Sequence, residues 1–362
     1  MTKSLCKIPY AQAFMNPDGS YRNCCSTTPQ ILGRETDFIK WWKGREMEHL
    51  RDSLQGEKLP TQCSKCQNEK EADQDSMLDV GWRDVKSIGE LPSRFQIGFS
   101  NICNIGCWSC DENFSSVIQE EKRAMGILPV DHIDPRKSFG ENWPSFKDHI
   151  LKSYEEHDSI LINVFGGEPT ISKEFVEFLQ TLVDLGLNER TRIEIFSNCN
   201  DPRDGFRTLL IDHKWEHISI LASIDAIGHA NDWIRYGSNW ESVERNFHEF
   251  RKVADYIEII SVLSPLNASI FPELKRYCDD KNIKHTTQLA NYPWFLDVLK
   301  WDGPIEFLGK EKDYDSVGYK DLWNKFSSNK TDGCQKHLID YIKTFKNRKT
   351  HQIFDDLIAS YN

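Results

Sequence analysis

Three cysteines stand close together in the stretch Asn101-Ile-Cys-Asn-Ile-Gly-Cys-Trp-Ser-Cys110. Cysteine thiolates bind zinc and iron–sulfur clusters, and a closed site normally has four protein ligands. Because Cys103, Cys107 and Cys110 supply only three ligands locally, they leave one coordination position open. In an iron–sulfur cubane, that position is an iron free to bind a small molecule. The alternative is a zinc ribbon that a distant Cys or His completes.

A second motif, Phe165-Gly-Gly-Glu-Pro169, directly follows the predicted strand Ile160–Phe165. Two glycines let the backbone come close to a ligand, and the carboxylate of Glu168 can pair with a cation. Taken alone, a Gly-Gly-Glu-Pro tetrapeptide is more often an ordinary turn. Its place one strand after the three cysteines favours the ligand-binding interpretation.

Polar side chains also follow the next two predicted strands. Ser197 and Asn198 end the third strand, Ser223 and Asp225 end the fourth, and Arg235 lies a short way beyond. Hydroxyl and carboxylate groups can bind ribose hydroxyls, and a guanidinium can pair with a carboxylate. The alternative is that Asp225 caps a helix and Arg235 forms a surface ion pair. Because ligand sites of open α/β folds collect at the carboxyl ends of strands, we expect these side chains to share one site.

Together these motifs resemble those of the radical S-adenosylmethionine (radical SAM) superfamily. The C-x3-C-x2-C spacing, with the aromatic Trp108 after the middle cysteine, is similar to the cluster loop of that family, and Phe196-Ser-Asn-Cys-Asn200 is similar to its Thr-Asn-Gly element, with Cys199 in place of the glycine. The resemblance implies a [4Fe–4S] cluster on Cys103, Cys107 and Cys110, whose free iron chelates SAM. An electron from the cluster would cleave SAM to a 5′-deoxyadenosyl radical that abstracts a substrate hydrogen. The SAM-binding residues that the resemblance implies are Trp108, Gly166, Gly167, Glu168, Ser197, Asn198, Ser223, Asp225 and Arg235.

The amino-terminal part contains a second group of cysteines. Cys6, Gly19 and Cys24 reproduce the opening of the SPASM or twitch extension of radical SAM enzymes, and Cys63 and Cys66 supply a second pair. The resemblance implies that Cys6, Cys24, Cys63 and Cys66 hold one auxiliary [4Fe–4S] cluster. Structural zinc is the alternative, because two well-separated cysteine pairs are also what a four-cysteine zinc site requires. Cys25 could replace Cys24 as a ligand.

Short β-rich runs alternate with helical patterns from Arg94 onward, which predicts βα units around a parallel sheet. The long connection after the first strand contains Pro129, Pro135 and Pro144, and we expect it to be irregular. The resemblance implies an α/β fold with a partial (β/α)6 barrel. We therefore expect a cysteine-rich module over 1–92, the barrel over 93–291 and a helical extension over 292–362. The predicted strands are Arg94–Ser100, Ser159–Phe165, Arg192–Ser197, His217–Ile224, Ile257–Leu263 and Lys284–Leu289.

Composition narrows the class of protein. The 362 residues are 39% hydrophobic and carry a formal net charge of −11, which disfavours sequence-independent binding to nucleic acid. No apolar run approaches the roughly 18 residues of a membrane span, and the first residues lack a secretory signal, so we expect a soluble, cytoplasmic protein. Eleven cysteines in such a protein indicate metal or redox chemistry rather than disulfides.

The sequence thus predicts a radical SAM enzyme that modifies a peptide and takes electrons from a donor such as flavodoxin or ferredoxin. Two alternatives remain open: a radical SAM enzyme acting on a small metabolite or nucleotide, and a non-enzymatic iron–sulfur or zinc protein. No residue is singled out as a catalytic acid, base or radical relay.

Overall fold

The computed structural model describes residues 5–26, 32–56, 58–71, 88–129, 132, 135–290, 292–326, 331, 333–349 and 351–361. The chain divides into two compact units. The first consists of Met1–Ile102, Pro129–Ile195 and Asp204–Ser219, and the second of Cys103–Leu128, Phe196–Arg203 and Ile220–Asn362. The chain therefore passes from the first unit into the second at the first of the three clustered cysteines.

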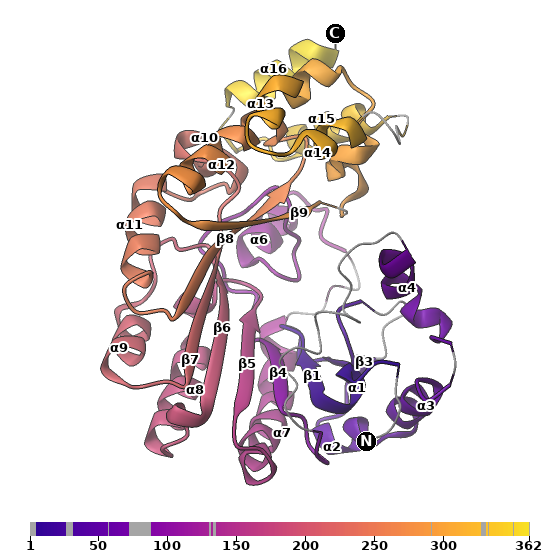
Figure 1. The fold of residues 1–362 in the computed structure, drawn as a ribbon, viewed down its shortest axis with the longest axis vertical. Coiled ribbons are helices and arrows are strands. Elements are labelled where there is room, and N and C mark those ends of the chain that lie inside the picture. Colours follow the sequence, from indigo (N-terminus) through magenta and orange to yellow (C-terminus); the bar gives the residue numbers. More distant parts are fainter. Residues whose placement is uncertain are drawn as a thin grey trace. The chain divides into compact units, whose positions relative to one another are not determined.

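The first unit is built on a mostly parallel sheet (Figure 1), whose order is β3-β2-β1-β4-β5-β6. Strands β1, β4, β5 and β6 run parallel, whereas β2 pairs antiparallel with both β1 and β3. The buried apolar run of β5 is typical of a parallel strand covered on both faces. The strands are β1 (Gln12–Met15), β2 (Tyr21–Arg22), β3 (Leu32–Gly33), β4 (Arg94–Gly98), β5 (Ile160–Phe165) and β6 (Thr191–Ser197).

Helices pack on this sheet through aromatic side chains. Phe99, just after β4, contacts Trp143 of α7 and Phe175 of α8, with ring centroids 5.0 and 5.1 Å apart. Helix α8 begins where Ser172 accepts a hydrogen bond from the Phe175 backbone N–H, as its N-cap position requires. The helices of this unit are α1 (Ile8–Ala11), α2 (Phe38–Trp42), α3 (Arg45–Ser53), α4 (Ser64–Glu71), α7 (Pro135–Glu156), α8 (Lys173–Asp184) and α9 (Asp204–Asp212), with 3-10 turns at Thr61–Cys63, Pro169–Ile171 and Asn188–Arg190.

The amino-terminal strands are part of the same core. Strand β1 pairs with β4 over its whole length. The ring of Tyr21 in β2 stacks on Phe146 of α7 at 5.6 Å, and Phe38 of α2 meets Phe146 edge-on at 5.0 Å. Burial of these large rings joins β2 and α2 to the core of the sheet.

The second unit contains the end of β7 (His217–Ser223) and the parallel pair β8 (Tyr256–Leu263) and β9 (Lys284–Leu289). A buried apolar cluster joins the loop around Trp108 to helices near the carboxyl end, including Leu338 and Phe345. The helices are α6 (Ser116–Ala124), α10 (Gly228–Ile234), α11 (Trp240–Phe250), α12 (Phe271–Asp280), α13 (Glu311–Asp315), α14 (Lys320–Lys325), α15 (Cys334–Thr344) and α16 (Gln352–Tyr361), with 3-10 turns at Ala268–Ile270, Trp294–Leu296, Val298–Lys300 and Ile305–Leu308.

The α/β class with a mostly parallel sheet is confirmed, and each of the six predicted strands is present within one or two residues. The expectation of an irregular connection after the first strand is wrong, because α6 and the 22-residue α7 occupy much of it. Pro135 begins α7, where the missing N–H of proline costs nothing. Pro144 lies inside α7, but Phe139, Phe146 and Ile150 on the same helix are buried and stabilise it. No helix in the described part of the chain is long and apolar enough to cross a membrane.

Candidate functional site

The three-cysteine loop of the second unit is held by backbone hydrogen bonds to the segment after α10. The Gly106 N–H donates to the Tyr236 carbonyl at 2.7 Å, and the Trp108 N–H donates to the Ile234 carbonyl at 3.1 Å. The residues on either side of the predicted Arg235 therefore lie directly against the loop.

The start of α6 holds the same loop from its other end. The Ser116 hydroxyl accepts a hydrogen bond from the Cys103 N–H at 3.1 Å, and the Ser115 hydroxyl donates to the Ile105 carbonyl at 3.1 Å. Ser115 is also the N-cap of α6 and accepts from the Ile118 N–H. Two adjacent serines thus tie the helix and the loop together, so the protein itself determines the course of the loop.

The thiols of the loop lie in a low-polarity environment that two cations partly offset. Burial raises the pKa of the Cys107 thiol, while the guanidiniums of Arg235 and Arg348 act in the opposite direction. Burial, followed by the neighbouring Cys107 thiol, raises the pKa of Cys110. Thiolate ligands beside fixed positive charge are the donor set that a metal centre uses.

Asn198 lies next to the first cysteine. Its side-chain amide donates to the Cys103 sulfur at 3.9 Å and to the Asn104 side-chain oxygen at 2.9 Å. Cys199 has φ +58°, in the left-handed region that favours glycine, which is where the family element has glycine. Ser197 is buried, and its hydroxyl accepts from the Cys199 N–H at 3.0 Å. The strand end thus aims the Asn198 amide at the cysteine loop.

Asp225 and Arg235 form a buried ion pair. Their side chains are 2% and 12% exposed, and Arg235 Nη1 lies 2.8 Å from Asp225 Oδ2. Asp225 Oδ1 also accepts from the Val262 N–H at 2.7 Å. Burial opposes the charge of Arg235, but the Cys107 thiol and Asp225 together raise its pKa. Arg235 is therefore not a surface residue, and its Nε has no hydrogen-bond partner in the described part of the chain.

The Gly-Gly-Glu motif lies in the first unit and packs on the residues that lead into the cysteine loop. Gly167 has φ +57°, and a Cβ there would lie 2.3 Å from the Ile102 carbonyl oxygen, so only glycine fits. The Glu168 N–H donates to the Ile102 carbonyl at 2.8 Å. The Glu168 carboxylate accepts from the Thr170 N–H and hydroxyl at 3.1 and 2.7 Å, and so caps the 3-10 turn that follows.

Trp108 is packed rather than exposed. Its side chain is 1% exposed and contacts the rings of Trp233, Tyr236, Tyr341 and Phe345. Within the second unit the structure thus brings Asn198, Asp225 and Arg235 into the surroundings of the three cysteines. Ser223 is the last residue of β7 and is half-buried.

The four amino-terminal cysteines influence one another in the first unit. The pKa of Cys6 is raised to about 11, mainly by burial and further by the Cys63 and Cys66 thiols, and Cys63 is also raised to a pKa of about 11, mainly by burial. Cys6 contributes in turn to the raised pKa of Cys24, whose hydrogen bond with Cys25 is the main cause. Cys6 therefore lies within electrostatic reach of Cys24, Cys63 and Cys66.

Cys25 differs from the other amino-terminal thiols. It is exposed, and its hydrogen bond with the Cys24 thiol lowers its pKa to about 6, with the hydroxyl of Ser26 and the charge of Arg22 acting in the same direction. A thiol of this kind is a competent ligand, so the choice between Cys24 and Cys25 stays open.

Both groups of cysteines have the donor chemistry that an iron–sulfur cluster needs. Among the described residues, however, no group of three or more His, Cys, Asp or Glu side chains is arranged so that it could hold a metal ion. In the second unit, the Asn198 amide at the Cys103 sulfur and the unpartnered Arg235 Nε suit a negatively charged, sulfur-ligated group with an anionic ligand beside it.

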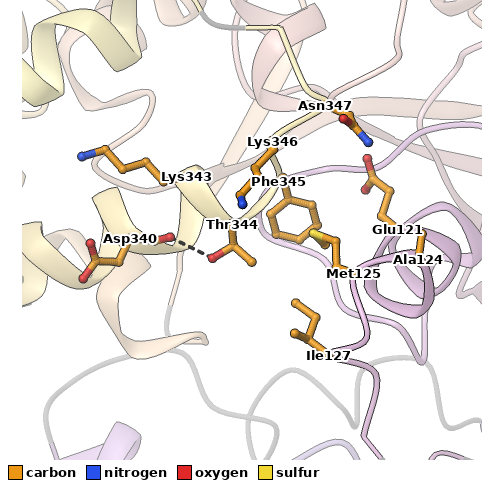
Figure 2. A pocket seen from close by; sticks show the side chains of 10 residues that line it. All are labelled: Glu121, Ala124, Met125, Ile127, Asp340, Lys343, Thr344, Phe345, Lys346 and Asn347. Atoms are coloured by element: carbon orange, nitrogen blue, oxygen red, sulfur yellow. Dashed lines mark hydrogen bonds between the residues drawn. The ribbon is translucent and has the colours of Figure 1, made fainter.

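A pocket of about 640 Å³ also lies in the second unit (Figure 2). Figure 2 shows the end of α6 on one side and the end of α15 on the other, with Met125, Ile127 and Phe345 as apolar lining and Lys343 and Lys346 as cations. Its lining includes none of the predicted cluster ligands or SAM-binding residues.

No family model matches the chain, and no curated protein matches it. Some solved structures are similar to part of the chain. Histidine-tagged anSMEcpe with bound AdoMet matches at 18% identity and a TM-score of 0.41, covering 66% of this chain and 60% of that one. Streptococcus suis SuiB bound to S-adenosylmethionine matches at 15% and 0.40, covering 77% and 57%. SuiB bound to its precursor peptide SuiA matches at 14% and 0.39, covering 93% and 71%. The chain thus spans less than two thirds of the first two solved chains.

Arg348 is the residue of this region that sequence analysis missed. It lies in the segment after α15, yet its guanidinium stands 4.3 Å from the Trp108 ring. No motif marks it in the sequence, where it follows Lys346 and Asn347 in a polar stretch.

Proposed function

We propose that this chain is a radical SAM enzyme that holds a SAM-cleaving [4Fe–4S] cluster on Cys103, Cys107 and Cys110. The observation that carries the proposal is the environment of the three-cysteine loop in the second unit. The 234–236 segment fixes the loop by backbone hydrogen bonds, the Asn198 amide meets the Cys103 sulfur, and the charge of Arg235 acts on Cys107. These contacts join three motifs that the sequence resemblance identified separately.

The residues of the chain would position SAM and its cluster. Arg235 would pair with the SAM carboxylate through the Nε that has no partner among the described residues, while Asp225 keeps the guanidinium oriented. Ser223, at the end of β7, would bind the ribose, and Asn198 would hydrogen-bond to a cluster thiolate. Gly166, Gly167 and Glu168 would hold the SAM amino group, as the family resemblance implies.

The bound cluster and SAM would supply the one-electron chemistry that generates a hydrogen-abstracting radical. The protein contributes orientation and exclusion of water. Trp108 and Cys107 are 1% and 8% exposed, so the loop is already shielded on the side of the aromatic cluster. A dry environment strengthens the electrostatic interactions around the cluster.

We further propose that Cys6, Cys24, Cys63 and Cys66 hold one auxiliary [4Fe–4S] cluster, with Cys25 as the alternative to Cys24 and zinc as the competing metal. The proposed substrate is a peptide, because auxiliary clusters are common in the peptide-modifying branch that the sequence resembles. The competing functions are a radical SAM enzyme for a small metabolite or nucleotide and a non-enzymatic metal protein. A flavodoxin-like or ferredoxin-like donor would supply the electron.

Metal analysis of anaerobically reconstituted protein tests the proposal first. Two cubanes predict about eight irons with matching sulfide per chain. Zinc without sulfide would contradict both cluster assignments, and about four irons with zinc would restrict the cluster to one region.

Reductive cleavage of SAM to 5′-deoxyadenosine tests catalysis. We expect Cys107→Ala to reduce cleavage to the level of cluster-free protein, whereas Cys278→Ala, in α12 and fully buried, keeps it. Iron uptake without SAM cleavage would favour the non-enzymatic alternative. Transfer of deuterium from labelled candidate peptides or metabolites into 5′-deoxyadenosine then separates the two substrate classes.

A further inference from the structure

Arg348 is a charged residue buried among aromatic rings. Its side chain is only 2% exposed, and its guanidinium carbon lies 4.3 Å from the Trp108 ring, 4.5 Å from the Phe345 ring and 4.7 Å from the Tyr236 ring. Arginine is almost never fully buried unless it is paired. Here the rings provide cation–π attraction from several directions, which is strongest where water is excluded.

Glu121 of α6 supplies the counter-charge. Arg348 Nε and Nη2 donate to the two carboxylate oxygens of Glu121 at 3.1 and 2.5 Å, in the bidentate geometry that only arginine provides. The third nitrogen, Nη1, is buried and has no hydrogen-bond partner in the described part of the chain. The position of the guanidinium is therefore determined by a carboxylate and three rings.

The cysteine loop leaves room for this guanidinium at Gly106. A Cβ added to Gly106 would lie 2.7 Å from Arg348 Nη2 and 3.0 Å from Val117 Cγ1. The backbone of Gly106 is not in the left-handed region, so its conformation does not require glycine. The lack of room for a side chain does. The spacer between two predicted cluster ligands thus packs directly on Arg348.

Arg348 also acts on the loop through its charge. Its guanidinium packs on Gly106, the residue directly before Cys107, so a fixed positive charge stands next to that predicted ligand. The carboxylate of Glu121 offsets part of the positive charge of Arg348. Because the Glu121 side chain is 27% exposed, water partly screens its own charge.

We propose that Arg348 is a positioning residue of the three-cysteine site, which anchors the cluster loop to the carboxy-terminal segment at Gly106 and places a fixed positive charge beside the cluster. The electrostatic part rests on the proposed function, while the anchoring holds for metal-free protein as well. Two experiments test the two parts separately.

A double-mutant cycle in metal-free protein tests the anchor. Gly106→Ala should raise the unfolding equilibrium constant about tenfold, the cost of overpacking at a site that cannot relax. In an Arg348→Ala background the same substitution should cost clearly less, because its main steric partner is gone. Gly140→Ala is the control, since a Cβ there meets nothing within 4 Å. Equal costs of Gly106→Ala in both backgrounds would overturn the anchor.

If Arg348→Ala does not fold, Arg348→Lys takes its place in the cycle, because lysine keeps the charge and lacks the fork that reaches Gly106. A smaller cost of Gly106→Ala in that background again supports the anchor, and an equal cost overturns it.

A redox titration of the reconstituted protein, followed by the electron paramagnetic resonance signal of the reduced cluster without SAM, tests the charge. Arg348→Met should shift the reduction potential to a more negative value, because a cation that stabilises the added electron is removed. Arg348→Lys should keep most of the original potential. An unchanged potential in Arg348→Met would overturn the electrostatic role. If the unsubstituted protein takes up no iron–sulfur cluster, the proposed function fails, and the double-mutant cycle still decides the anchor.

Discussion

The two cysteine-rich regions of the molecule differ in how their ligands are gathered. Cys103, Cys107 and Cys110 lie within one short loop, which backbone hydrogen bonds, two serines and Arg348 hold in place. Cys6, Cys24 and the pair Cys63 and Cys66 come from three separate stretches of the first unit. The difference teaches that the first loop is organised by the protein itself, whereas the second set would depend on the proposed auxiliary metal to hold distant segments together.

Removal of the proposed metal should give the largest difference in hydrogen exchange between the two cysteine-rich regions. In chelator-treated protein, hydrogen exchange in Ser64–Glu71 should accelerate by about 10²–10³-fold, because binding energy that held the segment is lost. The N–H groups of Gly106 and Trp108 should stay within about tenfold of their original rates, since their backbone acceptors remain. Mass spectrometry of exchanged peptides measures both, and equal acceleration in the two regions would break the comparison.

The next-largest effect is expected at alkaline pH, in the unfolding free energy that the amino-terminal thiols contribute. The folded pKa of Cys6 and of Cys63 is about 11, above the usual value near 9. A raised thiol pKa contributes stability that is fully present below about pH 9 and is lost as the pH rises through the folded pKa. Metal-free protein should therefore lose about 1–3 kcal/mol of unfolding free energy through these two thiols between pH 9 and 11.

Denaturant unfolding at several pH values measures that loss, and the double substitution Cys6→Ser with Cys63→Ser is its control. The buried tyrosines titrate in both proteins and cancel in the difference. Parallel pH profiles of the two proteins would show that the thiols contribute nothing.

Gly167→Ala tests the comparison at the segment that leads into the three-cysteine loop. Strain at φ +57° and the contact with the Ile102 carbonyl should cost about 2–3 kcal/mol of stability and lower iron uptake on that loop alone. Gly186→Ala is a matched control, because it has φ +66° with nothing within 4 Å and should cost only about 1 kcal/mol. Calorimetry and iron analysis report both effects, and equal costs at the two glycines would contradict the close packing.

Arg22→Met should have the smallest effect. Arg22 stands over the Phe14 ring at 3.5 Å and lies near Cys24 and Cys25, as Arg348 does near Cys107. Loss of this cation–π contact should cost about 1 kcal/mol. The three-cysteine cluster should keep its reduction potential, in contrast to Arg348→Met, and a shift in both variants would remove the distinction between the two regions.

Sequence patterns predicted the elements whose signal is local. Short β-rich runs identified β4 to β9. Strands β1 to β3 were missed because four-residue and two-residue strands are too short to show a period. Helix α7 was missed because its prolines signal a break unless buried packing, as at Phe146, compensates.

The residues of the functional site could likewise be predicted only where a local sequence signal marks them. Asn198 was found because it ends a predicted strand, and Arg235 because it lies a short way beyond another. The structure places both by the cysteines. The mutual pairing of Asp225 with Arg235 was not predicted, since it depends on how β7 and α10 meet. Arg348 gave no signal at all, because its partners are far away in sequence and its neighbours are ordinary polar residues.

The contact between Glu121 and Arg348 has a consequence for synthesis of the protein. These residues are 227 positions apart, and a ribosome adding about 5–20 residues per second needs on the order of 10–50 s to cover that distance. During this interval the three thiols have left the ribosome without their anchor, whereas all four amino-terminal cysteines are already made. If the proposed clusters form in both regions, the amino-terminal set of cysteines would therefore be accessible to iron and sulfide first.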